Sequence, residues 1–236
     1  MRITPAGDSA LRIELAAAIG EAESLRVQSA CAALDAAAIP GLTELVPAYT
    51  TLTAHYDARV VAAACAPADD LVGWLSLRVA QALEKLPAKP ARKGRLVEIP
   101  VCYGGEFGPD LEAVAAHTKL GRDEIVRLHQ KEEYLVYLLG FAPGFPYLGK
   151  ISPKLAMPRR AAPRPSVAPG SVGIVNDQTC IYPLATPGGW NLLGRTPLRL
   201  FNPAENPPAL LQSGDRVRFR AIDAAEFARL QREGKQ

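Results

Sequence analysis

Apolar residues alternate with polar ones near the start of the chain and then change to a helical period. Residues 2–15 alternate around a Pro-Ala-Gly-Asp turn and put Leu11, Ile13 and Leu15 on one side, which predicts a β-strand. Over residues 21–38 the apolar side chains recur mostly at three- and four-residue spacing, which predicts a helix that a Pro-Gly pair ends. The pattern therefore begins with a strand followed by a helix.

The next segment returns to a strand pattern. Residues 42–57 carry spaced aliphatic and tyrosine side chains among threonines, which predicts two short strands bent at Pro47. We expect a second helix over residues 67–86, with Asp69 and Asp70 in its first turn, where they favour the helix dipole. This β-α-β-α order predicts a small α/β domain.

A basic segment without apolar periodicity follows this run. Residues 85–95 read KLPAKPARKGR and combine proline with lysine and arginine, which is typical of a linker. We therefore predict two domains, an N-terminal domain over residues 1–88 and a C-terminal domain over residues 94–236.

Strand patterns dominate the C-terminal part. Alternation and β-branched content predict a strand over residues 96–103, and two short helices are predicted over residues 110–118 and 122–130. A last helix is predicted over residues 223–232, with Asp223 as its N-cap. Four other segments have strand character: GSVGIV, TCIYPL, RTPLRLF and DRVRFRAI. Short strands with frequent turns favour a closed or sandwich-like β-domain, which makes the whole chain an α+β protein.

The stretch from residue 134 to 197 departs from these regular patterns. An apolar run ends at Leu139, and the chain continues as Gly-Phe-Ala-Pro-Gly-Phe-Pro, whose prolines restrict the backbone. Flexible linkers use glycine and serine, whereas this stretch mixes proline with Phe145, Tyr147 and Trp190. We therefore predict a rigid aromatic loop, the kind of segment on which binding sites lie.

The same stretch concentrates positive charge in a chain whose net charge is only +3. Between residues 134 and 204 seven basic residues accompany one acid, Asp177, so this window carries +6 and the remainder of the chain −3. The seven are Lys150, Lys154, Arg159, Arg160, Arg164, Arg195 and Arg199. Arginines between prolines suit the binding of carboxylate or phosphate, and Arg159, Arg160 and Arg164 favour such an anion site. Solvated surface charge is the alternative.

Several classes of function are excluded by what the sequence lacks. The arginines do not follow one helix face and no zinc-finger or RNA-binding pattern occurs, so we expect no nucleic-acid partner and no metal site. No apolar run approaches about 20 residues and no signal-peptide centre occurs, which predicts a cytoplasmic protein with reduced cysteines and no membrane contact. The GxSxG, HExxH and P-loop motifs are absent, so we expect a site that is completed by another protein chain.

Two isolated features have a structural and a functional interpretation. The Gly-rich segment GGEFGPDL either cradles phosphate with its amides or only connects a strand to a helix. His55 has no nearby histidine, cysteine or glutamate, so we expect a packed or surface residue rather than a ligand.

Four long motifs, taken together, resemble one known family. GFAPGFPYLG, PRRAAPRPSVAPGSVGI, IYPLATPGGWNLLGRTP and QSGDRV resemble the signature series of the 5-oxoprolinase B-subunit (PxpB) family, also called the KipI-like or allophanate hydrolase subunit 1 family. The resemblance implies a small N-terminal α/β domain and a cyclophilin-like β-barrel. It also implies a component of the enzyme that opens 5-oxoproline to glutamate with ATP. That enzyme works with a larger, homologous C subunit and a ring-opening A subunit, and ATP with magnesium is expected at a site shared with the partner.

The resemblance also indicates candidate site residues. His129 matches the pattern LHxxxEYxVxxxGFxPGFPYLG and is the candidate catalytic residue, while a histidine at a helix end is equally favoured by the dipole. The candidate substrate- or nucleotide-binding residues are Gly144, Phe145, Tyr147, Arg159, Arg160, Arg164, Gly188, Gly189, Trp190 and Arg195. The Pro-Gly-Gly-Trp turn either exposes its amides and its ring or buries the ring in a hairpin.

Two other functions remain open at this point. The first is a KipI-like inhibitor that binds a sensor histidine kinase and needs no chemistry. The second is a component of a urea carboxylase or allophanate pathway. Because the Met-Lys-Met motif is absent, we expect no biotin on this chain.

Overall fold

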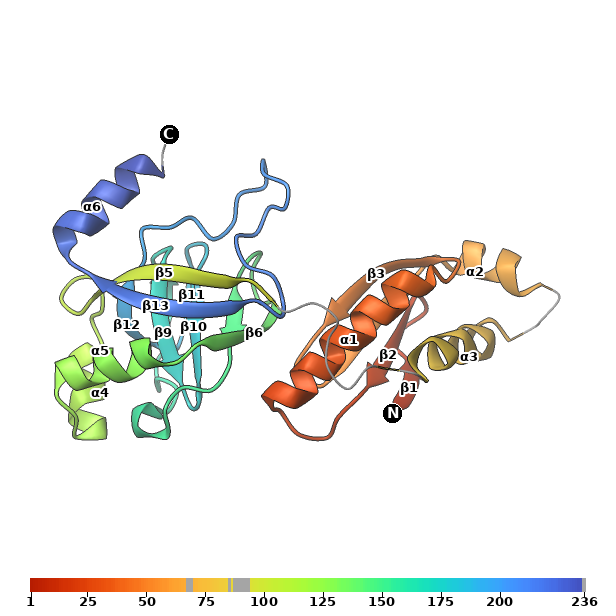
Figure 1. Cartoon of the computed structure of the whole chain (residues 1–236), viewed down its shortest axis with the longest axis horizontal. Coiled ribbons are helices and arrows are strands. Elements are labelled where there is room, and N and C mark those ends of the chain that lie inside the picture. Colours follow the sequence, from red (N-terminus) through yellow and green to blue (C-terminus); the bar gives the residue numbers. More distant parts are fainter. Residues whose placement is uncertain (67–69, 85, 87–93, 235–236) are drawn as a thin grey trace. The chain divides into compact units, whose positions relative to one another are not determined.

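The chain forms two compact units, Met1–Lys93 and Gly94–Gln236, each with its own hydrophobic core (Figure 1). A computed structural model describes residues 1–66, 70–84, 86 and 94–234. The predicted linker, residues 85–95, lies mostly outside these described residues.

The N-terminal unit is built on a four-stranded antiparallel sheet with the order β1-β2-β4-β3. Its strands are β1 (Arg2–Pro5), β2 (Ala10–Glu14), β3 (Leu42–Pro47) and β4 (Thr51–Tyr56). Leu11 and Ile13 are fully buried, so the face predicted from alternation is the core face. His55 is half-buried on β4 and pairs across the sheet with Ala10.

Three helices complete this unit. They are α1 (Glu21–Ala37), α2 (Ala58–Cys65) and α3 (Leu71–Leu83). The helix expected over residues 21–38 is confirmed, but the single helix expected over residues 67–86 is wrong at its start. Asp57 caps α2 by accepting two backbone amides, and Asp70 is the N-cap of α3 rather than a first-turn residue. Asp69 lies outside the described residues.

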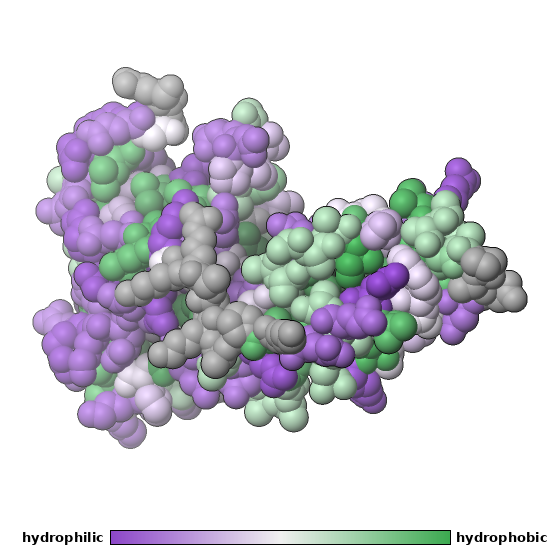
Figure 2. All heavy atoms as spheres, turned by 45° about the vertical axis from the view of Figure 1, so that its right-hand side comes forward, coloured by the Kyte–Doolittle hydropathy of each residue, from purple (hydrophilic) through white to green (hydrophobic). Residues whose placement is uncertain are grey.

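The outer side of α1 is rich in alanine. Ala32, Ala36 and Ala37 are exposed, while Val27 and Leu34 pack into the core. Figure 2 shows pale green, weakly apolar surface on this unit, interrupted by purple hydrophilic residues. Helix formation here therefore depends on alanine's high intrinsic propensity as well as on a buried stripe.

The C-terminal unit is a closed seven-stranded barrel with the order β10-β7-β6-β13-β5-β12-β9. Its strands are β5 (Leu96–Tyr103), β6 (Tyr134–Leu139), β7 (Pro146–Leu148), β9 (Ser171–Val175), β10 (Gln178–Ile181), β12 (Asn191–Arg195) and β13 (Arg216–Ile222). Among the described strands, only β5 and β13 pair in parallel; they are yellow and blue in Figure 1. The predicted α+β fold class with a closed β-domain is confirmed.

One strand prediction in this unit needs correction, and one strand pair was not predicted. A strand is predicted over residues 195–201, but β12 ends at Arg195, and beyond it only an isolated bridge joins Phe201 to Ala209. Pro197 has no backbone N–H for a ladder. A two-stranded ribbon of β8 (Arg164–Val167) and β11 (Thr186–Gly188) lies beside the barrel sheet.

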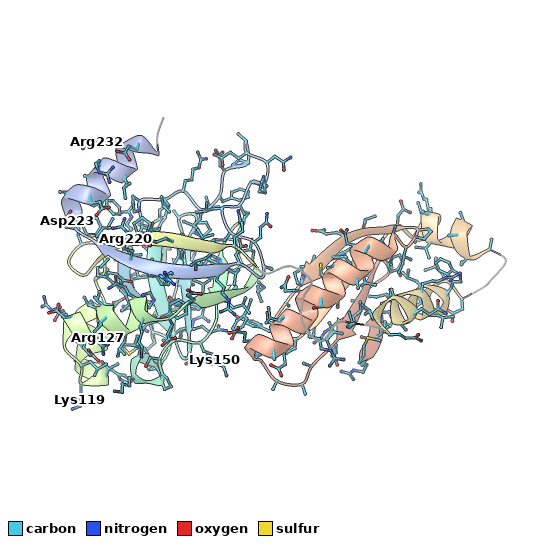
Figure 3. All side chains as sticks on the ribbon, viewed as in Figure 1. Lys119, Arg127, Lys150, Arg220, Asp223 and Arg232 are labelled. Atoms are coloured by element: carbon cyan, nitrogen blue, oxygen red, sulfur yellow. The ribbon has the colours of Figure 1, made fainter. Side chains whose placement is uncertain are left out.

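The helices of this unit begin and end close to their predicted bounds. They are α4 (Leu111–Thr118), α5 (Arg122–Lys131) and α6 (Ala224–Glu233), and a 3₁₀ turn that was not predicted, η1 (Pro153–Leu155), lies between α5 and α6 in the sequence. Asp223 caps α6 by accepting the Glu226 amide at 2.7 Å. The Glu226 carboxylate binds Arg220 of β13 instead of completing a capping box. Figure 3 shows Asp223 and Arg232 towards opposite ends of α6.

All four cysteines lie among the described residues, and none forms a disulfide there. Cys65, Cys102 and Cys180 are buried, and Cys31 is half-buried. Burial raises the pKa of Cys31, Cys102 and Cys180, which keeps these groups protonated and unreactive. Within the described ranges, no helix has both the length and the apolar character that a membrane span requires.

Candidate functional site

A small pocket opens where the loop between β6 and β7, residues 140–145, meets the Pro-Gly-Gly-Trp turn before β12. We call it the aromatic pocket; it has a volume of about 220 Å³. Its walls are Phe141, Phe145, Tyr147, Arg159, Pro163, Tyr182, Pro187, Gly188, Gly189 and Trp190. Six of the predicted binding residues therefore meet here: Phe145, Tyr147, Arg159, Gly188, Gly189 and Trp190.

Phe145 is the centre of the aromatic wall. Its ring contacts Tyr182 edge-on at a centroid distance of 5.1 Å, Tyr147 at 5.0 Å and Trp190 at 6.2 Å. Trp190 is buried, which agrees with the interpretation in which its turn is a hairpin that buries the ring. The ring nevertheless forms part of the pocket wall. Tyr147 also contacts Trp190, so these two rings and Phe145 each pack on the other two and hold a fixed shape.

Gly144 supports the pocket without lining it. Its φ of 76° lies in the left-handed region, and a Cβ at this position would meet the Cβ of Phe201 at 2.9 Å. The glycine therefore permits the turn that delivers Phe145 to the core.

Phe141 forms an exposed rim to the pocket. Its side chain is 64% exposed, and it packs edge-on against Phe145 at 5.3 Å. Its φ of 70° is unusual for an aromatic residue, and backbone strain of this kind tends to occur at functional sites. Sequence reasoning missed Phe141 and Tyr182 as site residues, although both belong to the motifs that predicted the loop.

Among the described residues, Arg159 is the one arginine that lines this pocket. The side chain is exposed, and no hydrogen bond or ion pair joins it to another residue in the part of the chain that the structure describes. Burial raises the pKa of Tyr147 and Tyr182, and the Arg159 charge acts in the opposite direction on both phenols. A cation with free donors therefore faces an apolar wall, an arrangement suited to a small planar anion.

Arg160 and Arg164 correct the charge-based prediction. Both bind the protein's own Asp110, with N–O distances of 2.8 Å for Arg160 and 2.8 and 2.9 Å for Arg164. Asp110 is buried and lies outside the acid-poor window from which an anion site is predicted. These two arginines therefore neutralise an internal carboxylate and do not present a free fork to a ligand.

Arg195 also lies outside the aromatic pocket. Its Nε donates to the carbonyl of Pro169 at 2.9 Å, and its side chain lines a separate hollow together with Arg199. The structure therefore does not bring Arg195 together with Arg159.

The Gly-rich segment after β5 is a connecting turn. The amide of Gly104 donates to the Leu193 carbonyl, and the amides of Phe107 and Gly108 donate to the Gly104 carbonyl. Amides that already donate inside the protein do not cradle a phosphate. These three amides are therefore not available to a phosphate, which favours the connecting-turn interpretation.

His129 lies in the barrel core and not in the pocket. It is completely buried and stacks on Phe219 at a centroid distance of 4.4 Å. Its Nε2 lies 2.9 Å from the Thr179 hydroxyl, which itself donates to a carbonyl, so Nε2 carries the hydrogen. The Tyr103 hydroxyl then donates to Nδ1 at 2.8 Å. Burial lowers the pKa of His129 to about 3, so the ring is neutral and saturated, which fits the structural interpretation.

Comparisons with known proteins agree on one family. The family model for the carboxyltransferase domain, subdomain C and D, matches residues 1–211. The B subunit of 5-oxoprolinase from Bacillus subtilis (strain 168) is 45% identical over 231 residues, which are 96% of this chain and 95% of that protein.

Two solved structures share the fold. TTHA0988 has a TM-score of 0.78 at 39% identity; the match covers 91% of this chain but only 40% of that longer chain. The Kluyveromyces lactis urea amidolyase has a TM-score of 0.75 at 16% identity, covering 98% of this chain and 15% of that one, and indicates the fold alone.

Proposed function

Since this chain belongs to the 5-oxoprolinase B-subunit family of carboxyltransferase-domain proteins, we propose that it acts as the B subunit of an ATP-dependent 5-oxoprolinase. The proposed reaction converts 5-oxo-L-proline, ATP and water to L-glutamate, ADP and phosphate. One observation supports placing the substrate site in the aromatic pocket: among the described residues, the pocket holds one guanidinium without a partner, that of Arg159.

The dimensions of the pocket suit a small ring with one carboxylate. At about 220 Å³ it is smaller than the roughly 300–1,000 Å³ of pockets that bind drug-sized ligands. The rings of Phe145, Tyr147 and Trp190 would face the methylene groups of the substrate, and Arg159 would hold its carboxylate. In this role the chain orients the lactam carbonyl towards the pocket mouth and shields it from bulk water.

ATP and magnesium do not fit the described part of this chain. A triphosphate needs several cations, but the pocket offers one, and the amides of Gly104, Phe107 and Gly108 in the Gly-rich turn already donate within the fold. Among residues 1–66, 70–84, 86 and 94–234 no group of three or more His, Cys, Asp and Glu side chains could hold a metal ion. We therefore assign no step involving the nucleotide to this chain and propose that the C and A subunits supply that site.

The longer TTHA0988 chain supports a partnership. A domain similar to this chain makes up 40% of TTHA0988, so the fold occurs joined to further sequence. We propose that the C subunit takes the corresponding place here as a separate chain. We propose a cytoplasmic location, because the four cysteines form no disulfide among the described residues.

The Arg159 site can be tested in the assembled complex. Arg159→Ala should weaken 5-oxoproline binding by about ten- to a hundredfold, because a charge-assisted hydrogen bond contributes about 1.5–3 kcal/mol. Its unfolding temperature should not change, since the side chain is exposed. Arg229→Ala, at an exposed position of α6, is the matched control and should bind normally. Normal binding by Arg159→Ala in calorimetry would remove the pocket from the proposed function.

A second measurement addresses the partnership. We expect the isolated chain to show no 5-oxoproline-dependent ATP hydrolysis and the activity to appear on addition of the C and A subunits. Robust turnover by the isolated chain would contradict the incomplete site.

A further inference from the structure

The backbone on both sides of Arg159 is tied to the pocket wall. The amide of Arg160 donates to the carbonyl of Gly189 at 2.9 Å, and the side-chain amide of Asn191 donates to the carbonyl of Pro158 at 2.9 Å. The loop that carries Arg159 is therefore fixed immediately before and after this residue.

Asp110 joins the same loop to β12 through its carboxylate. Oδ1 accepts from Arg160 and Arg164, and Oδ2 accepts from Arg164 and from the amide of Leu192 at 2.7 Å. The Asp110 side chain is only 4% exposed, so these bonds form away from bulk water. We call the group of Asp110, Arg160, Arg164 and the Leu192 amide the Asp110 clamp.

The charges of the clamp make Asp110 the member that holds it together. One carboxylate serves two guanidiniums, so the clamp carries a net charge of +1, and each arginine depends on Asp110 for its ion pair. Without the negative charge, two half-buried guanidiniums would repel each other and be left with unpaired donors. The segment of residues 158–164 would keep its hydrogen bonds to Gly189 and Asn191 but lose both side-chain anchors, and we expect this loss to let it move together with Arg159.

We propose that Asp110 is a positioning residue that holds Arg159 at the aromatic pocket for carboxylate binding. Asp110 does not line the pocket, so it acts through the loop rather than on the ligand. This inference rests on the proposed function of the pocket, and its first test requires no ligand. Arg164 anchors the far end of the loop with a two-bond fork, and Arg160 anchors the residue next to Arg159.

Asp215 provides a matched control in the same unit. It is a second buried aspartate, and it accepts from the guanidinium and amide of Arg95 and from the amide of Gln212. Neither Asp215 nor its partners line the aromatic pocket. Asp110→Asn and Asp215→Asn should therefore have comparable effects on folding and different effects on Arg159.

Hydrogen exchange tests the clamp without a ligand. Asp110→Asn should increase amide exchange over residues 158–164, above all at the Arg160 amide, while Asp215→Asn leaves this segment protected. Unchanged protection in Asp110→Asn would overturn the proposal. Should Asp110→Asn fail to fold, Arg164→Lys keeps the charge, breaks the two-bond fork and should cause the same local loss of protection.

Binding of 5-oxoproline to the complex then tests positioning. Asp110→Asn should raise the Kd by about tenfold, and Asp215→Asn should leave it within the error of the measurement. In an Arg159→Ala background, Asp110→Asn should cause no further loss, because both changes remove the same contact. A further tenfold loss in that background would show that Asp110 does not act through Arg159. If the wild-type complex binds no 5-oxoproline, the proposed function fails, and hydrogen exchange alone decides the clamp.

Discussion

Two aromatic clusters in the C-terminal unit differ in whether the side chain that they surround has hydrogen-bond partners: His129 does, and Arg159 does not among the residues described. Around His129 the rings of Tyr103, Tyr134 and Phe219 enclose an imidazole whose two nitrogens both have partners. Around Arg159 the rings leave a guanidinium exposed and without a partner among the residues described. A buried and saturated group contributes to the fold, whereas a group with free donors beside an apolar wall is available to a ligand.

The largest expected effect comes from removing the imidazole of the saturated cluster. His129→Ala would leave a cavity and deprive the Tyr103 and Thr179 hydroxyls of a partner, so we expect it to cost about 3–5 kcal/mol of stability in denaturant unfolding. His117→Ala, at an exposed histidine in the last turn of α4, is the control and should cost little. Folded His129→Ala protein should still bind 5-oxoproline in the complex; loss of binding per folded molecule would reverse the comparison and return His129 to the site.

Lowering the pH should reduce the stability that the buried, neutral His129 contributes. Burial lowers the pKa of His129 from 6.5 to about 3, so the unfolded chain takes up a proton at a pH where the folded protein does not. The stabilisation is complete above pH 6.5 and is lost as the pH falls from 6.5 towards 3, by at most about 1.4 kcal/mol per pH unit. Unfolding midpoints of the wild type and His129→Gln across this range measure the difference. Parallel curves would mean that His129 does not titrate on unfolding.

The smallest effect concerns the rim of the open cluster. Phe141 has a φ of 70°, which glycine adopts without the cost that a Cβ brings. Phe141→Gly should therefore be more stable than Phe141→Ala by about 1 kcal/mol, since both lose the ring and only one keeps the Cβ. Thermal unfolding of the two variants provides the test, and equal stabilities would show that the backbone there is unstrained.

The fold could be predicted from the sequence where the apolar residues of a segment recur with a clear strand or helix period. Alternation placed Leu11 and Ile13 on the core face, and helical spacing gave the bounds of α5 within one residue. The spacing of apolar residues did not predict the bounds of short elements such as α2. The eight residues of α2 are mostly alanine and valine, and their start depends on the side-chain cap of Asp57.

The site followed from the sequence only where its parts belong to recognisable motifs. Phe145 and Trp190 come from two motifs and meet in one pocket. The pairing of Arg160 with Asp110 spans 50 residues and depends on how β12 and the start of α4 approach each other, which no local pattern contains. A charge count over one window therefore assigned three arginines to a ligand, although Arg160 and Arg164 are ion-paired with Asp110. The burial of His129 likewise requires Thr179, 50 residues further along.

The parallel pairing of β5 with β13 also has a consequence for the order in which the chain folds. Arg95 binds Asp215 across 120 residues, and the seven-residue ladder beside this pair closes the barrel. Loops of this length make closure slow, because their entropy must be lost before the ladder stabilises the product. During synthesis, one edge of β5 therefore stays unpaired until β13 has left the ribosome. The described N-terminal sheet, in contrast, pairs strands that all lie within residues 2–56. We expect the first unit to become resistant to protease before the barrel does.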